Sequence, residues 1–433
     1  MKKFLTSTGL VALSISGLQA AYAPELTPME TSKPWSVSAA LRGFYDDNYT
    51  TSPNDAAEET FGYEFKPSVS LNLPLDQTFF GVSYEYTLKY YEDRKGDKYD
   101  QSHEFDLRLD HRFSERYKIE VNDSLVIAQE PEVLSPGSIS TPLRTEGDNL
   151  RNLGTIDFTA QLTELLDLEL GYANTFYDYE QENNGSSLDQ ANAPSRSGLL
   201  DRIEHEFRAD LRWQMLPETS GILGYTFGIV DFTSDEEIGI NSNTNSPAFG
   251  SFISADARNN RSHRAYVGAD HRFSPQLNGS ARVGGQYTDY YNDNETAISP
   301  YVDASLAYQY NRGNHLQVGI NHSRNQTDVA AFDASSEDIT RDQESTRVYA
   351  SIEHKITPNL VGSALVQAQY STFEGGRDDG ESELLFLSGV NLAYHFNQHW
   401  LAEVGYNFDR LDSDLSGRSY SRNRAYIGVR ATY

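Results

Sequence analysis

An alternation of apolar and charged residues constrains this chain more than any other feature. Between Arg202 and Trp213 one set of alternate residues is apolar or aromatic, apart from His205. The other set is a ladder of charges: Arg202, Glu204, Glu206, Arg208, Asp210 and Arg212. A period of two is that of a β-strand, whose successive side chains point to opposite faces. An arginine facing lipid at the bilayer midplane costs about 2–4 kcal/mol, so the charged face is expected to meet water.

Segments with the same alternation recur to the last residue, about eighteen in all. They begin near Trp35, Phe61, Phe79, Ser102, Tyr117, Asn149, Asp167, Arg202, Gly221, Ser262, Leu277, Tyr301, His315, Ser345, Leu360, Leu384, Trp400 and Asn423. An even number is expected because bacterial barrels close with antiparallel strands. A count of sixteen or twenty is also compatible with the pattern.

The connections between these segments alternate between short and long. Short links include Pro74 to Thr78, Ser114 to Arg116, Ser274 to Gln276, Thr357 to Asn359 and Asn397 to His399. Long polar links include Asp46 to Thr60, Glu130 to Asp148, Glu180 to Asp201, Ser234 to Arg261 and Gln326 to Glu344. Short turns at one end and long loops at the other are typical of transmembrane barrels. The sequence therefore predicts an all-β, up-and-down antiparallel barrel with short periplasmic turns and long extracellular loops.

Composition agrees with this fold and excludes several functions. The chain is 38% hydrophobic, yet it holds 28 Tyr and 21 Phe, the residues enriched at membrane–water boundaries. It has no cysteine, which excludes a disulfide framework, a thiolate metal site and a cysteine nucleophile. The formal net charge of −28 argues against a nucleic-acid partner, because no basic face is offered to phosphate.

The N-terminus has the composition of a secretory signal peptide. Lys2 and Lys3 precede an apolar stretch from Phe4 to Leu18, and small residues follow at a cleavage region. We expect a signal peptide over 1–20, with an alternative cut after Ala23 that would place Pro24 directly behind it. A short periplasmic lead would then cover 21–34 and the barrel 35–433.

The C-terminal strand resembles the closing strand of bacterial outer-membrane proteins. Ile427, Val429 and Tyr433 share one face of an alternating segment that ends in an aromatic residue. That resemblance implies recognition by the barrel-assembly machinery, although Tyr433 replaces the commoner Phe. The mature chain as a whole is similar to the β-barrel porin families of Gram-negative bacteria, some of which are associated with exopolysaccharide export. The resemblance implies an outer-membrane location, no cofactor and no catalytic motif.

The alternate residues on the charged face of each strand, here called the charged parity, are the candidate pore-lining residues. They are Arg108, Asp110, Arg208, Asp210, Arg212, Arg264, Asp270, Arg272, Arg347, Glu353 and Arg430. Opposed basic and acidic walls would set a transverse field that selects polar solutes. The alternative interpretation is that these residues pair across strands and stiffen the wall.

Three further patterns have weaker functional interpretations. His111, His271 and His354 recur in similar turns but face the lipid side, so interfacial hydrogen bonding is favoured over a metal site. Asp412 and Asp414 match the first half of a calcium-binding loop, without its closing Glu. The proline-containing loop 131–142 is a hypothetical constriction of the pore.

Three functions remain open at this stage. A channel for passive diffusion of small polar solutes fits the pattern best. A barrel associated with exopolysaccharide export and a structural or adhesive barrel are the alternatives. An enzyme is not expected, because no nucleophile with a positioned base is visible. The expected surroundings are outer-membrane lipid and lipopolysaccharide, and a homotrimer is one option for the assembly.

Overall fold

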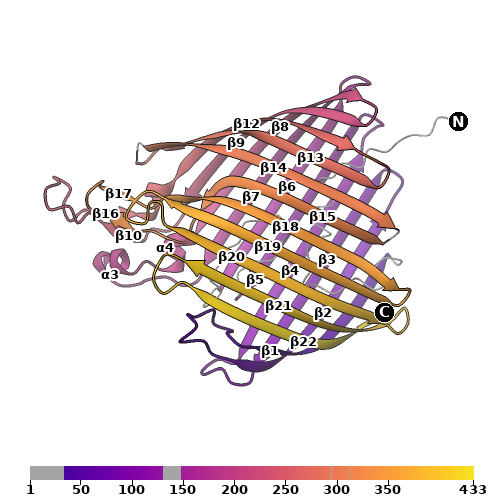
Figure 1. Cartoon of the computed structure of the whole chain (residues 1–433), viewed down its shortest axis with the longest axis horizontal. Coiled ribbons are helices and arrows are strands. Elements are labelled where there is room, and N and C mark those ends of the chain that lie inside the picture. The colour runs from indigo at the N-terminus through magenta and orange to yellow at the C-terminus, as the bar shows by residue number, and fades with distance from the viewer. Residues whose placement is uncertain (1–33, 130–147, 294, 312) are drawn as a thin grey trace.

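The computed structural model describes residues 34–129, 148–293, 295–311 and 313–433, which form one closed antiparallel barrel of eighteen strands (Figure 1). The strands are β1(Trp35–Asp46), β2(Thr60–Pro74), β3(Thr78–Tyr91), β4(Tyr99–Arg112), β5(Tyr117–Ala128), β6(Asn149–Gln161), β7(Leu166–Tyr179), β8(Arg202–Leu216), β9(Thr219–Phe232), β12(Asn260–Arg272), β13(Leu277–Tyr290), β14(Glu295–Asn311), β15(Asn314–Gln326), β18(Asp342–Thr357), β19(Leu360–Glu374), β20(Ser382–His395), β21(Trp400–Ser413) and β22(Tyr420–Thr432). Each strand pairs with the next along the wall, and β22 pairs with β1 to close it. The predicted fold and strand number are confirmed.

The two ends of the barrel differ as the connection lengths predicted. Tight turns such as Ser114–Arg116 lie at the end where the C-terminus also lies, while the long loops gather at the opposite end (Figure 1). The largest difference from the sequence expectation is β14, which begins at Glu295 rather than near Tyr301. No helix of the described residues is long and apolar enough to cross a membrane.

Alternate residues of each strand face opposite sides of the wall. On β8, Phe207 is 47% and Trp213 54% exposed on the outer face, whereas Asp210 on the inner face is 1% exposed. The closing strand repeats this arrangement, with Ile427 exposed and Arg430 buried. The apolar parity is therefore available to acyl chains and the charged parity lines the interior.

Histidines on the outer face pair with hydroxyl groups of neighbouring strands near the ends of the barrel. His111 Nδ1 lies 2.8 Å from the Thr78 hydroxyl, and His271 Nδ1 lies 2.8 Å from that of Thr219. His354 lies 2.7 Å from the Tyr310 hydroxyl. These contacts give each imidazole a local partner, and the three residues do not converge on one site.

The long loops carry short elements that pack into a folded cap. These are α3(Ser187–Asn192), α4(Arg196–Leu200), β10(Glu237–Ile240), β11(Phe252–Ser254), η3(Ala255–Arg258), β16(Phe332–Asp333) and β17(Asp338–Ile339). Ile238 and Ile339 come from different loops and share a small apolar core. The fully buried Arg258 donates to the carbonyls of Leu199 and Thr327, which ties three loops together. Burial lowers the pKa of Arg258 to about 9.

Candidate functional site

The inner face of the barrel holds a dense set of ion pairs on one side. We call this region the ionic wall: Asp157, Glu169, Arg208, Asp210, Arg212 and Asp270, from β6, β7, β8 and β12. Arg208 lies 2.7 Å from Asp157 and 3.8 Å from Asp210. Arg212 pairs with Glu169 at 2.8 Å and also with Asp270. Arg212 and Glu169 lie on the adjacent strands β8 and β7, whose inner-face residues are opposite or diagonal to each other. Arg208 reaches Asp157 on β6 across Gly171 of β7, and Arg212 reaches Asp270 on β12 across β9.

Further charged side chains of the predicted set form separate pairs. Arg108 lies 2.9 Å from Asp110, two residues along the same strand. Arg264 lies 3.7 Å from Glu206 and donates to Gln286 at 3.1 Å. In the structure these charged side chains therefore pair with one another inside the wall, along one strand for Arg108 and between strands for Arg264.

The opposite part of the inner face has a different chemistry. We call it the carboxamide wall: Gln343, Gln367, Gln369 and Asn391, from β18, β19 and β20, each less than 5% exposed. Neither polar atom of the Gln367 carboxamide has a hydrogen-bond partner among the described residues, and the same holds for Gln343 Oε1 and Asn391 Oδ1. Much of the hydrogen-bonding capacity of this wall is thus unused by the protein.

Arg347 lies within the carboxamide wall, opposite Gln369 in the β18–β19 register. It is 3% exposed, and its Nε and Nη1 atoms have no hydrogen-bond partner among the described residues. No carboxylate among the described residues lies within ion-pair distance of the Arg347 guanidinium. Asn321 stands opposite Arg347 on β15, and its amide donates to Asp303 at 3.2 Å. Arg347 is therefore a buried guanidinium without an ion pair among the described residues.

The remaining predicted residues are dispersed. Arg272 lies at the periplasmic end of β12, and Glu353 is half-buried on the inner face of β18. Arg430 is 6% exposed on the inner face of β22. The predicted set is therefore spread around the barrel instead of forming one cluster.

The sequence analysis missed three buried ion pairs where the barrel closes. Arg42 on β1 contacts Glu64 at 2.8 Å and Glu403 at 2.5 Å. Arg422 on β22 donates from Nε to both carboxylate oxygens of Asp46 at 2.9 and 3.0 Å. Alternation alone places Arg42 and Arg422 on the charged face, but their partners are up to 376 positions away in the sequence.

The weak calcium candidate has other partners in the structure. Asp412 accepts two hydrogen bonds from Arg410, both at 2.9 Å, and Asp414 accepts from the backbone and hydroxyl of Ser382. The described residues contain no group of three or more His, Asp or Glu that could hold a metal ion. The hypothetical constriction at 131–142 and the signal peptide lie outside the described residues.

A closed antiparallel barrel with an apolar outer face and a charged interior defines the class of this protein. It is a transmembrane β-barrel of the outer membrane, whose closed sheet has no free edge strand in the lipid. Residues 341–433, which include the last five strands of the wall, match the family model described as "Putative beta-barrel porin 2". The resemblance to the bacterial β-barrel porin families is confirmed over this part of the chain. No curated protein sequence matches the chain.

Solved structures with a similar outline are outer-membrane proteins at low sequence identity. The outer membrane protein OpdK from Pseudomonas aeruginosa is 11% identical, with a TM-score of 0.42 over 92% of this chain and 99% of that one. A BenF-like porin from Pseudomonas fluorescens is 11% identical, with a TM-score of 0.45 over 93% and 99%. OccAB4 from Acinetobacter baumannii is 14% identical, with a TM-score of 0.44 over 93% and 99%.

Proposed function

We propose that this protein is an outer-membrane channel for passive diffusion of small polar solutes. The observation that carries the proposal is a barrel of eighteen strands whose inner face is polar or charged. Barrels of sixteen to eighteen strands are wide enough for an aqueous channel, unlike eight-stranded ones that side chains fill. The match of residues 341–433 to a β-barrel porin family supports the same function.

The two walls favour polar solutes of low net charge. Charges of both signs alternate along the ionic wall, so neither cations nor anions meet a continuous field of one sign. The carboxamide side chains of the other wall are uncharged, so they add no field of either sign. The residues named as pore-lining would act through these two surfaces together.

Several associated roles belong to the same proposal. Residues 1–20 would direct export, and the outer face of the last strand, with Ile427, Val429 and Tyr433, would be read by the barrel-assembly machinery. Lipopolysaccharide would surround the loops, and a homotrimer is the assembly that we would test first. We infer no catalytic function and no cofactor. No observation on the described residues favours polysaccharide export or a purely adhesive role.

Conductance of the refolded chain in a planar bilayer tests the proposal. We expect stepwise, ohmic conductance, together with swelling of proteoliposomes in neutral sugars and amino acids. Heat-dependent migration in detergent gels would establish that the barrel is folded in the same preparation. A folded barrel that gives neither conductance nor swelling would contradict the proposal and leave a structural role.

A further inference from the structure

The barrel wall has a seam between β14 and β15 at its extracellular end. These strands pair only from Val302 opposite His322 to Asn311 opposite Asn314. Above that point β14 continues to pair with β13 as far as Glu295, and β15 continues to pair with β18 as far as Gln326. Residues 295–301 of one strand and 323–326 of the other therefore have no partner across the seam.

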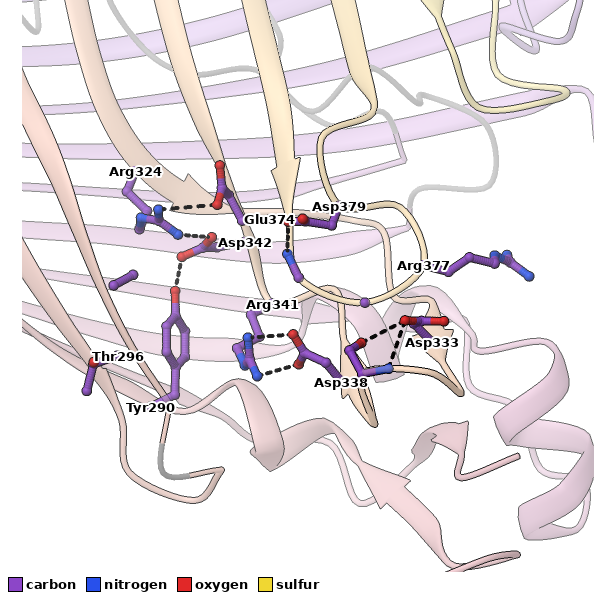
Figure 2. A pocket seen from close by; sticks show the side chains of 14 residues that line it. Tyr290, Thr296, Arg324, Asp333, Asp338, Arg341, Asp342, Glu374, Arg377 and Asp379 are labelled. Carbon is purple, nitrogen blue, oxygen red and sulfur yellow. Dashed lines mark hydrogen bonds and ion pairs between the residues drawn. The ribbon is translucent and has the colours of Figure 1, made fainter. Parts of the chain in front are cut away.

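The two edges of the seam overlap. Tyr290 has the inner-face parity of β13, whereas Asp342 has the outer-face parity of β18, yet the Tyr290 hydroxyl donates to the Asp342 carboxylate (Figure 2). Arg341 reaches Asp293, beyond the end of β13, at 2.7 Å. Such contacts require the end of β13 near Tyr290 to lie over the outer side of β18. We call the β13–β14 edge of the seam the outer lip and the β15–β18 edge the inner lip. Side chains, and not backbone hydrogen bonds, hold the two lips together here.

The seam begins near the outer boundary of the hydrocarbon layer. The paired part of β14 and β15 spans nine residue steps on β14, which is about 30 Å along a strand and about 23 Å along the barrel axis at the usual tilt. The apolar band of such barrels is about 25 Å tall. Ile298, on the outer lip, is 81% exposed. The seam therefore opens sideways at the level of lipid head groups.

A cavity of about 520 Å³ lies between the lips, and Figure 2 shows its charged lining. Tyr290, Thr296 and Ala297 come from the outer lip. The rest come from the inner lip and the loops above it: Arg324, Asp333, Ser336, Asp338, Arg341, Asp342, Glu374, Gly375, Gly376, Arg377 and Asp379. This volume is within the range of small-molecule sites.

Carboxylates outnumber guanidinium groups in this cavity. Its lining holds five Asp or Glu and three Arg. Arg324 is shared by Asp342 at 2.7 Å, Glu344 at 2.8 Å and Glu374 at 3.6 Å. Since one cation serves three carboxylates, a further positive charge would be stabilised there. Because the seam opens toward lipid beside the exposed Ile298, the cation that fits it is the head group of an amphiphile.

We propose that the β14–β15 seam is a lateral binding site for an amphiphile with an ammonium head group. The head would lie between the lips beside Asp342 and Glu374, and the alkyl chain would remain in the lipid beside Ile298. The site is separate from the central lumen, so it does not depend on conduction through the barrel.

Photolabelling of the refolded chain in lipid bilayers tests this site. The probe is dodecyltrimethylammonium with a diazirine on its alkyl chain, and labelled peptides are located by mass spectrometry. We expect labelling concentrated on residues 295–301 and 322–326, and little labelling there by probes of the same length with a sulfate or maltoside head. The double substitution Asp342→Asn with Glu374→Gln should reduce labelling about tenfold, the effect of one charge-assisted contact.

Two further variants make the test specific. Asp412→Asn removes a carboxylate at another part of the mouth and should leave labelling unchanged. Tyr290→Phe removes the hydrogen bond from Tyr290 to Asp342 without removing a charge, and labelling should persist or increase. Equal labelling by the sulfate probe, full labelling of the double variant, or complete competition by millimolar Mg²⁺ would overturn the proposal. Conductance is measured on every variant, so that failure of the channel proposal can be distinguished from failure of the lateral-site proposal.

Discussion

The ionic wall and the carboxamide wall occupy the same parity of the same barrel but use it differently. On the ionic wall Arg212 is shared by two carboxylates, and its side chain is 14% exposed. On the carboxamide wall Gln367 is 1% exposed, and both of its polar atoms lack a partner among the described residues. On the ionic wall the charged side chains pair with one another. On the carboxamide wall several polar atoms have no hydrogen-bond partner among the described residues. Stability is therefore expected to depend on the first wall and selectivity on the second.

The largest effect is expected from Arg212→Gln. This change leaves Glu169 and Asp270 without their shared guanidinium and should lower the free energy of unfolding by about 3 kcal/mol, the lower end for breaking a buried pair. The channel should also become more selective for cations. Urea unfolding in lipid, followed by tryptophan fluorescence, measures the first effect, and reversal potentials measure the second.

Arg410→Gln is the matched control. The side chains of both members of its ion pair with Asp412 are more than half exposed, so the loss of stability should be far smaller than for Arg212→Gln. Equal destabilisation by the two substitutions would show that the ionic wall adds nothing beyond ordinary surface pairs.

A smaller effect on stability and a larger one on selectivity are expected from Arg347→Gln. Removing a buried charge that has no ion pair should leave the free energy of unfolding unchanged or raise it by about 1 kcal/mol. Anion permeability should fall several-fold relative to cation permeability. Marked destabilisation with unchanged reversal potential would mean that Arg347 is a structural member of the wall.

The smallest effect concerns the mouth above the ionic wall. Burial raises the pKa of Asp201 from 3.8 to about 6, despite hydrogen bonds from Ser197 and the Tyr179 amide. The folded state thus holds the proton more tightly than the unfolded chain, and local stability should fall as pH rises from about 4 through 6. The Tyr179 amide lies 2.7 Å from Asp201, and its protection factor, the intrinsic exchange rate divided by the observed one, should fall over that range.

Asp201→Asn should abolish this pH dependence. Asp189→Asn is its control, because hydrogen bonds from Ser186 lower the pKa of that exposed carboxyl and place its titration below the range. A protection factor at Tyr179 that does not change with pH in the unsubstituted protein would show that Asp201 does not titrate over this range.

Much of the fold was predictable because its rules act locally. Alternation on Arg202–Trp213 identifies a strand and its faces, since an arginine is costly against lipid wherever the strand lies. The strand number and the difference between the two ends follow from the same pattern repeated. The parity of Arg208, Asp210 and Arg212 was also readable, but the sequence could not say whether they face a solute or each other.

The tertiary structure decided which charges meet and where the wall departs from a regular ladder. Arg42 meets Glu403 only because β1 and β22 close the barrel, which brings residues 361 positions apart into contact. The first six residues of β14, which alternation did not mark as strand, form the outer lip of the seam. A period of two encodes which face a side chain takes, but it holds no information about the partner across a closure or an overlap. Those depend on curvature and register summed around all eighteen strands.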